Sequence, residues 1–327
     1  MVLEKVGQPL VLVDRPTPQP NSDQILIKVV ACGVCRTDLH LVDGELLNIH
    51  TPIIPGHEII GEVISVGSNA LLKIGTIVGV SWLGWTCGIC KYCMINQENL
   101  CDAAKFTGYQ LDGGYCEYTL ADHRYCIPLD HQIDAAKYAP LLCAGLIGYR
   151  SYKLAKFLNK DLRNIGLLGF GAAAHILTQI LVNQGKAIYA FTRPDDIASQ
   201  KFAKNLGVAW AGSSETQPPD MLDAAIIFAP VGRLVPQALK FVRKGGVVVC
   251  GGIHMSNIPQ FPYELLWGER HICSVANLTR KDGEEFFKIV NEIQIKTHIR
   301  SYPLEGANKA LDDLRNGNLN GAAVLIN

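Results

Sequence analysis

The sequence lacks three features that mark specialised classes of protein: an excess of charge of one sign, a long apolar run and a low-complexity tract. Its 30 basic residues balance its 30 acidic residues. Because no surplus positive charge is available for phosphates, we expect neither a nucleic-acid partner nor a membrane-surface partner. No run of about 18 apolar residues is present, so no membrane-spanning helix is expected.

A secretory signal is also missing from the N-terminal stretch MVLEKVGQPLVLVDRPTPQP, which meets polar and proline residues early. We therefore expect a cytoplasmic protein. In that compartment the 11 cysteines favour thiolates bound to metal over disulfides. The 327 residues, of which 48% are hydrophobic and 18% charged, are typical of a globular enzyme with two domains.

The first part of the chain is rich in predicted strands. Three apolar stretches that contain or end in glycine are expected to be strands: ILIKVVACGV (25–34), HEIIGEVISVG (57–67) and GTIVGVSWLG (75–84). The segment PLLCAGLIGYRSYKLA (140–155) is predicted to be helical where the two halves meet. We assign residues 1–145 to a first, β-rich domain. The tail 278–327, which ends in the predicted strand GAAVLIN, returns to that domain.

Strands and helices alternate in the second part of the chain. Predicted strands include NIGLLGFG, AIYAF, DAAIIFAP, GGVVVCGG and HICSVAN, and predicted helices include HILTQILVNQG, DIASQKFAKNLG and LVPQALKFV. This alternation predicts a parallel sheet with helices on both faces, the doubly wound α/β fold. We assign residues 146–277 to this second domain.

A glycine-rich turn, GFGAAA (169–174), connects the first strand and the first helix of that domain. Gly169 is expected to allow the tight turn, and Gly171 to let backbone N–H groups approach a pyrophosphate at the helix N-terminus. Ala174 is small enough for close packing of helix on strand. The turn therefore predicts dinucleotide binding, and the alternative is a plain strand–turn–helix connection without a ligand.

The end of the next strand, AIYAFTRP (187–194), bears on the choice of dinucleotide. NAD enzymes usually have a carboxylate here for the adenosine ribose, whereas this chain has Thr192 and Arg193. A hydroxyl and a guanidinium bind a 2′-phosphate, so NADP(H) is favoured. Asp195 and Asp196 nearby keep NAD(H) open, and Arg193 has the alternative role of a solvated surface residue.

Four cysteines fall within the segment CGICKYCMINQENLC (87–101). Four thiolates fill the tetrahedral coordination of one Zn²⁺ and leave no position for a substrate, so this site is predicted to be structural. An iron–sulfur cluster and a set of redox thiols are the alternatives, although the spacing is not one of the ferredoxin spacings. The predicted ligands are Cys87, Cys90, Cys93 and Cys101.

A catalytic zinc needs three protein ligands and an open position. The remaining candidates, Cys35, His57 and Cys143, are far apart along the chain, and their spacing alone does not join them. Taken singly, each cysteine is also compatible with a small buried apolar residue, and His57 with a hydrogen-bonded core histidine.

The chain nevertheless resembles the zinc-dependent alcohol dehydrogenases of the medium-chain dehydrogenase/reductase superfamily along nearly its whole length. The motifs that carry the resemblance are, in order, CGVCRTDLH, PGHE, the four-cysteine segment, PLLCAG and GFGAAA. The resemblance implies a GroES-like catalytic domain, a Rossmann nucleotide-binding domain and two zinc ions per chain. It implies that Cys35, His57 and Cys143 bind the catalytic zinc, and that Glu58 is a catalytic residue that lies behind the zinc and can ligate it transiently. Polyol dehydrogenases usually carry Glu in place of Cys143, and quinone reductases lack these ligands, so both are disfavoured.

The same resemblance assigns roles within CRTDLH. Thr37 receives the proton of the alcohol, and His40 is the outer end of a proton relay that passes through the nicotinamide ribose. Asp38 orients His57, and Arg36 contacts the cofactor pyrophosphate. As alternatives, Thr37 and Asp38 cap the following helix, and Arg36 and His40 are simply exposed.

The implied reaction is hydride transfer between a primary or small alcohol, or the corresponding aldehyde, and a nicotinamide cofactor. Trp82 resembles an aromatic residue of the family's substrate pocket; its alternative is a core tryptophan. The family's members form homodimers or homotetramers. The chain departs from the family pattern at Ala174, at Thr192 and in the C-terminal NGNLNGAAVLIN, which bears on cofactor choice. A redox sensor, a nucleic-acid-binding zinc module and an inactive relative are the rival interpretations.

Overall fold

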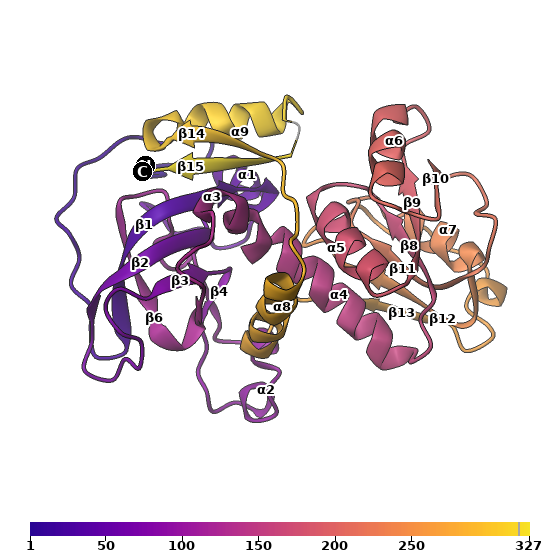
Figure 1. Cartoon of the computed structure of the whole chain (residues 1–327), viewed down its shortest axis with the longest axis horizontal. Coiled ribbons are helices and arrows are strands. Elements are labelled where there is room, and N and C mark those ends of the chain that lie inside the picture. Colours follow the sequence, from indigo (N-terminus) through magenta and orange to yellow (C-terminus); the bar gives the residue numbers. More distant parts are fainter. Residues whose placement is uncertain (320) are drawn as a thin grey trace. The chain divides into compact units, whose positions relative to one another are not determined.

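In the computed structural model, which describes residues 1–319 and 321–327, internal contacts divide the chain into two units (Figure 1). The first unit contains Met1–Cys143, Thr279–Phe287 and Lys296–Asn327, and the second contains Ala144–Leu278 and Lys288–Ile295. Residues 288–295 thus group with the second unit, whereas the sequence analysis assigned the whole of 278–327 to the first. Helix α8 (Arg280–Glu292) runs through this division.

The first unit is built on a seven-stranded sheet in the order β14-β15-β1-β2-β3-β7, with β6 paired to β1. The pairs are antiparallel except β14 with β15. In Figure 1 the yellow strand β15 lies beside the indigo strand β1, although the two are far apart in sequence. The strands are β1 (Gln24–Val34), β2 (Glu58–Val66), β3 (Ile77–Val80), β6 (Tyr118–Asp122), β7 (Cys126–Pro128), β14 (Ile299–Pro303) and β15 (Ala322–Ile326).

The predicted strand 75–84 is divided in the structure. Its first part, β3, joins the main sheet, whereas β4 (Leu83–Trp85) pairs with β5 (Lys105–Phe106) in a separate two-stranded sheet. The chain leaves the main sheet after Val80, and Ser81 and Trp82 connect β3 to β4. The helices of this unit are α1 (Arg36–Asp43), α2 (Lys91–Met94), α3 (Ala135–Tyr138) and α9 (Ala307–Arg315).

The second unit confirms the doubly wound fold. Its six strands are all parallel and lie in the order β10-β9-β8-β11-β12-β13. Apolar residues of α4 and α5 pack on one face of the sheet and those of α7 on the other. The elements are α4 (Ala144–Leu158), β8 (Asn164–Leu168), α5 (Ala172–Asn183), β9 (Ala187–Thr192), α6 (Ile197–Asn205), β10 (Trp210–Ser213), β11 (Leu222–Ile227), α7 (Leu234–Phe241), β12 (Val242–Cys250) and β13 (His271–Ser274).

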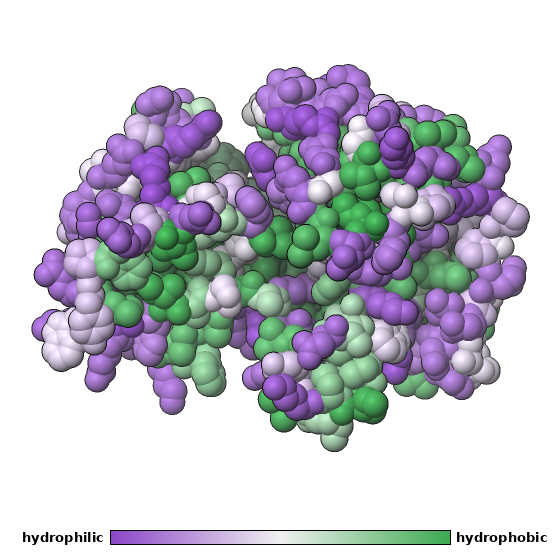
Figure 2. Space-filling view, turned by 180° about the vertical axis from the view of Figure 1, so that it is seen from behind, coloured by the Kyte–Doolittle hydropathy of each residue, from purple (hydrophilic) through white to green (hydrophobic). Residues whose placement is uncertain are grey.

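The surface carries polar and apolar residues side by side. On the face shown in Figure 2, hydrophilic residues are interspersed with smaller hydrophobic areas. Among the residues that the structure describes, no helix has both the length and the apolar character needed to cross a bilayer.

Candidate active site

Cys35 occupies the junction between β1 and α1. It is the N-cap residue of α1: its sulfur accepts a hydrogen bond from the Thr37 N–H at 3.3 Å, and its own N–H donates to Asp38 Oδ2 at 2.9 Å. The Cys35 side chain also accepts from the Asp38 backbone, and this bond together with the one to Asp38 Oδ2 forms a capping box in which cysteine takes the usual place of serine or threonine. The cap fixes the Cys35 sulfur at the end of β1, beside the positive end of the helix dipole, which favours a thiolate.

Pairing of β1 with β2 brings His57 to the same place. The two strands are antiparallel and Gly33 lies opposite Glu58, so the end of β1 and the residue before β2 are neighbours. His57 Nε2 lies 3.3 Å from the Cys35 sulfur. The pairing of β1 with β2 thus brings together Cys35 and His57, which their spacing in the sequence alone could not connect.

Cys143 completes the group from a third direction. It follows a short 3₁₀ helix (Ala139–Leu142) that packs on β1 and β2, and its backbone interrupts the predicted helix 140–155 before α4 begins. Its sulfur lies 4.0 Å from that of Cys35. Ligand atoms of Cys35, His57, Glu58 and Cys143 all lie within 4.8 Å of one another. The structure therefore brings together these four predicted residues.

Asp38 faces the outer side of the His57 ring. Its Oδ1 lies 3.4 Å from His57 Nδ1 and accepts a hydrogen bond from the Gly56 N–H at 3.2 Å. The Nδ1 atom makes no well-formed hydrogen bond with the described residues, so the contact is mainly electrostatic. It nevertheless directs Nε2 towards the sulfur atoms, as the carboxylates behind metal-binding histidines do.

Glu58 is almost fully buried, with 2% of its surface exposed. It fits because Gly33 has no side chain: a Cβ there would lie 1.8 Å from Glu58 Oε2. Burial raises the pKa of the Glu58 carboxyl well above its ordinary value. A carboxyl, two thiols and an imidazole buried together are stabilised when a cation supplies the missing positive charge. The donor set therefore fits a zinc ion.

The two thiols of this cluster are not equivalent. A hydrogen bond from Cys143 holds the pKa of Cys35 well below the usual range of a thiol, and the same contact raises the pKa of Cys143. Burial opposes the charged form of His57, but the Cys35 thiolate and the Asp38 carboxylate raise its pKa well above normal. The lowered pKa of Cys35 favours its thiolate, the form in which a cysteine binds a metal ion.

The four cysteines of the 87–101 segment also come together. The sulfur of Cys87 lies 4.0 Å from that of Cys93 and 3.6 Å from that of Cys101, and Cys90 lies 3.6 Å from Cys93. These separations are too long for disulfides and agree with the edges of a ZnS₄ tetrahedron, about 3.8 Å for Zn–S bonds of about 2.3 Å. Backbone N–H groups of Ile89 and Cys90 lower the pKa of Cys87 to about 6, whereas burial raises that of Cys101 to about 11.

Polar contacts that the sequence did not indicate hold this four-cysteine lobe in place. Thr86 shares a 2.6 Å hydrogen bond with Tyr125, next to β7. Glu98, which is buried within the lobe, accepts hydrogen bonds from the backbone and the guanidinium of Arg280 at 2.9 and 3.2 Å. No local motif predicts the second contact, because the two residues lie 182 positions apart.

The glycine-rich turn has the geometry that its sequence predicted. Gly169 adopts φ +93°, and a Cβ there would lie 2.7 Å from the Ala229 nitrogen. Gly171 is the N-cap of α5, and the space that its Cβ would occupy is open. Ala174, in the first turn of α5, is completely buried. The backbone N–H groups of the first turn of α5 are therefore accessible to an anion within this unit.

The two residues predicted to select the cofactor differ in their surroundings. Thr192 is buried, and its hydroxyl donates to the Arg193 carbonyl at 2.9 Å and accepts from Gln200 Nε2 at 3.0 Å. Arg193 is exposed and makes no ion pair with the residues that the structure describes. The Thr192 hydroxyl thus has protein partners already, whereas the guanidinium is available.

The remaining predicted residues lie beside the Cys–His–Cys cluster or on helix α1. Trp82 lies edge-on to His57, with ring centroids 4.9 Å apart, and stacks on Phe106 and Tyr109 at 5.2 and 5.7 Å. Thr37 and His40 are half-buried on α1, and Arg36 is exposed at its start. Phe106 and Tyr109 were not predicted; the segment KFTGY that contains them carries no motif of its own.

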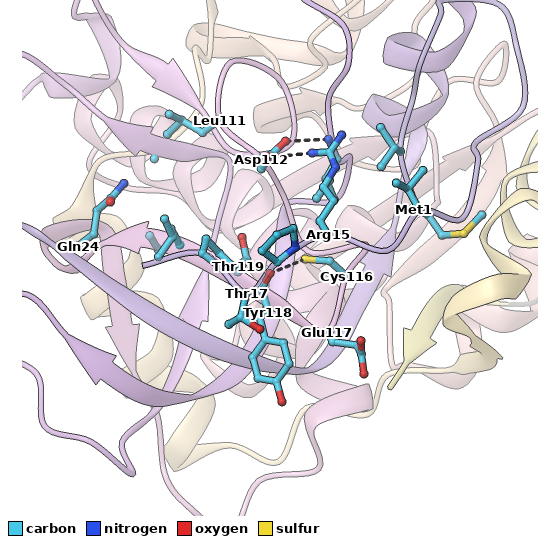
Figure 3. Close-up of a pocket in the computed structure, with 18 of the residues that line it drawn as sticks. Met1, Arg15, Thr17, Gln24, Leu111, Asp112, Cys116, Glu117, Tyr118 and Thr119 are labelled. Atoms are coloured by element: carbon cyan, nitrogen blue, oxygen red, sulfur yellow. Dashed lines mark hydrogen bonds and ion pairs between the residues drawn. The ribbon is translucent and has the colours of Figure 1, made fainter. Parts of the chain in front are cut away.

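A separate cavity of about 570 Å³ opens in the first unit between the extended segment 12–18 and β6 (Figure 3). In Figure 3, Arg15 and Asp112 point towards one another across it, with 3.8 Å between charged atoms, and Cys116 donates to the Tyr118 carbonyl. Within the described part of the chain, none of the predicted site residues lines this cavity. It is therefore distinct from the Cys–His–Cys cluster.

A doubly wound parallel sheet, in one chain with a half-buried Cys–His–Cys cluster and a four-thiol lobe, is the combination typical of metal-dependent oxidoreductases that use dinucleotides. Residues 21–131 match the alcohol dehydrogenase GroES-like domain. The protein named "Probable alcohol dehydrogenase AdhA" of Mycobacterium tuberculosis (strain CDC 1551 / Oshkosh) is 43% identical over 328 residues, which cover 97% of this chain and 93% of the relative. An alcohol dehydrogenase of Geobacillus stearothermophilus is 31% identical over 335 residues, covering 99% and 98%.

Solved structures agree with this assignment. The structure described as CAD from Helicobacter pylori complexed with NADP(H) superposes with a TM-score of 0.82 at 25% identity and covers 94% of this chain and 91% of that chain. Acetophenone reductase from Geotrichum candidum NBRC 4597 in complex with NAD gives 0.84 at 26% identity, covering 97% and 94%. The chain therefore belongs to the zinc-dependent alcohol dehydrogenases of the medium-chain dehydrogenase/reductase superfamily.

Proposed function

We propose that this protein interconverts primary or small alcohols and their aldehydes by hydride transfer to and from a nicotinamide cofactor. The observation that carries the proposal is the convergence of Cys35, His57 and Cys143, with Glu58 behind them, within 4.8 Å in the first unit. In this proposal the three residues hold a catalytic zinc, which when bound supplies Lewis-acid stabilisation of the negative charge on the substrate oxygen. Asp38 keeps the His57 ring in the orientation that this requires.

The residues of α1 supply the proton path in this proposal. The Thr37 backbone is held beside the cluster by its N–H bond to the Cys35 sulfur at 3.3 Å, so its side chain begins two residues from that ligand. We assign the Thr37 hydroxyl as the first acceptor of the alcohol proton and His40, one turn further along the helix, as the group that passes it to solvent through the ribose hydroxyls. Spacing of three residues places both side chains on one face of α1.

The four-cysteine lobe is assigned a second, structural zinc. Its four sulfur atoms lie within 4.8 Å of one another, and four thiolates on one zinc ion leave no position for a substrate. The ion pair between the buried Glu98 and the exposed Arg280 supports a structural role, because it connects the lobe to the start of α8 within the same unit.

For the dinucleotide we favour NADP(H), with Arg193 as the residue that recognises the 2′-phosphate. The support is the Arg193 guanidinium, which follows β9, is exposed and has no ion-pair partner among the described residues; a carboxylate in this place would have repelled that phosphate. In this proposal Thr192 positions the turn and does not bind the phosphate, because its hydroxyl is already hydrogen-bonded to Gln200 and to the Arg193 carbonyl. The Helicobacter relative was solved with NADP(H) and the Geotrichum relative with NAD, so both cofactors require testing.

The proposal is tested by assaying purified protein, with its zinc content measured, against a panel of primary alcohols and aldehydes with NAD(H) and NADP(H) in parallel. We expect turnover in both directions and a higher kcat/KM with NADP(H). The variant Arg193→Ala is expected to weaken NADP(H) binding by roughly tenfold, the effect of one charge-assisted hydrogen bond, without changing NAD(H) binding.

Three outcomes separate the parts of the proposal. Activity that prefers NAD(H) would keep the reaction and contradict the assignment of Arg193. Equal effects of Arg193→Ala on both cofactors would also contradict it. No turnover by protein that holds two zinc ions per chain, with the whole panel, would favour an inactive binding protein.

Trp82 is expected to limit the size of the substrate. Its ring lies against His57 and is held by Phe106 and Tyr109, so it forms a rigid wall beside the cluster. Trp82→Ala should raise kcat/KM for branched or bulky alcohols by about tenfold relative to short ones, since pocket contacts of this size are worth 1–3 kcal/mol. Trp82→Phe, which retains a stacked ring, is the matched control. An unchanged substrate profile in Trp82→Ala would show that Trp82 is only a core residue.

A further inference from the structure

Segment 46–50 of the first unit is anchored near both of its ends and exposed between the anchors. Leu46 and Ile49 pack against the core of that unit. Leu47 is 81% exposed, and Asn48 has φ +56°, the left-handed conformation of a turn. Among the described residues, the segment makes one hydrogen bond, in which the Leu47 carbonyl accepts from the Tyr109 hydroxyl. A turn with so few bonds opens locally at a small cost in free energy.

The ring of Tyr109 belongs to the aromatic group beside the Cys–His–Cys cluster. It lies nearly parallel to Trp82, at an interplanar angle of 13° and a centroid distance of 5.7 Å, and Trp82 in turn lies against His57. Phe106 stacks on both rings, 5.2 Å from Trp82 and 6.5 Å from Tyr109. Tyr109 therefore contacts the wall of the proposed substrate pocket with its ring and segment 46–50 with its hydroxyl.

The backbone positions Tyr109 without help from its hydroxyl. The Thr107 N–H donates to the Trp82 carbonyl at 2.8 Å. Gly108 has φ +74°, and a Cβ there would lie 2.8 Å from the Gly56 nitrogen, so the turn is closely packed. Burial raises the pKa of Tyr109, so its hydroxyl keeps its proton and remains a donor at neutral pH. The ring is thus placed by the turn, and the hydroxyl is available to hold the neighbouring segment.

We propose that Tyr109 determines substrate specificity by holding segment 46–50 beside the aromatic group; this inference rests on the function proposed above. Trp82 contacts His57 and restricts branching close to the reacting carbon. Segment 46–50 contacts Tyr109, one ring further from His57, and restricts bulk at the far end of the alcohol. The substrates that follow are primary alcohols with a narrow, unbranched chain. Tyr109 touches no reacting atom in this proposal and is a positioning residue.

Three variants separate the role of the hydroxyl from that of the ring. Tyr109→Phe keeps the stacked ring and removes only the bond to Leu47. Tyr109→Ala also removes the ring that supports Trp82, so it is expected to resemble Trp82→Ala. Tyr118→Phe is the matched control, because it removes the hydroxyl of a half-buried tyrosine that lies in the same unit, on β6, and outside the aromatic group.

The kinetic experiment measures kcat/KM of the zinc-loaded proteins with propanol, isobutanol and phenylpropanol. These alcohols differ in branching near the hydroxyl and in bulk at the far end. We expect Tyr109→Phe to raise kcat/KM for phenylpropanol relative to propanol about fivefold, the change that corresponds to one hydrogen bond between neutral groups. The gain should appear in KM for phenylpropanol, and kcat for propanol should stay within about twofold of wild type.

The other variants have distinct expected results. The preference for isobutanol over propanol should change in Trp82→Ala and in Tyr109→Ala but not in Tyr109→Phe. Tyr118→Phe should have the same preferences as wild type. An unchanged preference for phenylpropanol in Tyr109→Phe would overturn the specificity role of Tyr109 and leave the reaction intact.

Proteolysis tests the Tyr109–Leu47 bond without turnover. Chymotrypsin cleaves after leucine, and cleavage of a locally opened segment follows the population of the open form. We expect the zinc-loaded protein to be cleaved after Leu46 or Leu47 about fivefold faster in Tyr109→Phe than in wild type or Tyr118→Phe. Equal cleavage in all three would overturn the proposed holding of segment 46–50. Absence of turnover in the wild type would instead overturn the proposed function, and the specificity role with it.

Discussion

Cys143→Ser is expected to lower kcat/KM for alcohol oxidation by at least about 10³-fold. Stabilisation of the oxygen charge by a bound metal is worth several kcal/mol, and each 1.36 kcal/mol is a factor of ten in rate. Cys143 supplies one of the three proposed ligands, and its sulfur lies 4.0 Å from that of Cys35. A serine hydroxyl is not ionised at neutral pH and is a poor ligand for zinc.

Zinc content and nucleotide binding distinguish this loss from misfolding. The variant should hold one zinc ion per chain instead of two and should still bind the dinucleotide, whose proposed turn lies in the second unit. Cys116→Ser is the matched control: its half-buried thiol donates to two backbone carbonyls, a role that serine can fill, and it lies outside both clusters. Full activity in Cys143→Ser, or in protein stripped of zinc, would refute the proposed mechanism.

Cys101→Ser is expected to have the largest effect on stability. Cys101 is the most buried of the four lobe cysteines, with 6% of its surface exposed. Metal binding is coupled to folding, so the loss of one ligand leaves three thiols without a closed site. For a loss of about 3 kcal/mol we expect the melting temperature to fall by roughly 10 °C.

The measurement is thermal unfolding together with metal analysis. Cys101→Ser should lose the second zinc but keep the one in the Cys35–His57–Cys143 cluster, and kcat per folded molecule should change little. The Cys126→Ser variant, which alters a buried thiol outside either cluster, controls for the general cost of a core substitution. Unchanged stability with one zinc lost would show that the zinc of the lobe does not stabilise the fold. A coloured, iron-containing protein would support the iron–sulfur alternative.

The parts of the site that are local in sequence could be predicted from residue types and spacing. The four lobe cysteines and the turn GFGAAA each lie within 15 residues, and their geometry follows from short-range constraints. Cys35, His57 and Cys143 could be joined only through resemblance to a family, because their proximity depends on the pairing of β1 with β2 and on the 3₁₀ helix before Cys143.

Other features were beyond local reasoning for different physical reasons. The apolar pattern of the predicted strand 75–84 is continuous and does not show where the strand is divided. The division arises because its first part pairs with β2 and its last part pairs with β5. The hydroxyl of Thr192 suggested a phosphate ligand. In the structure it is bonded to the Arg193 carbonyl and to Gln200, and the sequence pattern does not predict these hydrogen bonds.

The position of β15 has a consequence for how the protein is made. The last four residues of β1 lead directly into Cys35, and they are flanked by β2 on one side and by β15 on the other. The second unit's sheet, by contrast, draws all its strands from residues 164–274 and is complete earlier on the chain. During synthesis all strands of the second unit's sheet are therefore available before β15 has been made. We expect the residues around Cys35 to reach their final arrangement only after the strands of the second unit have been synthesised, because closing the long loop between β1 and β15 comes last.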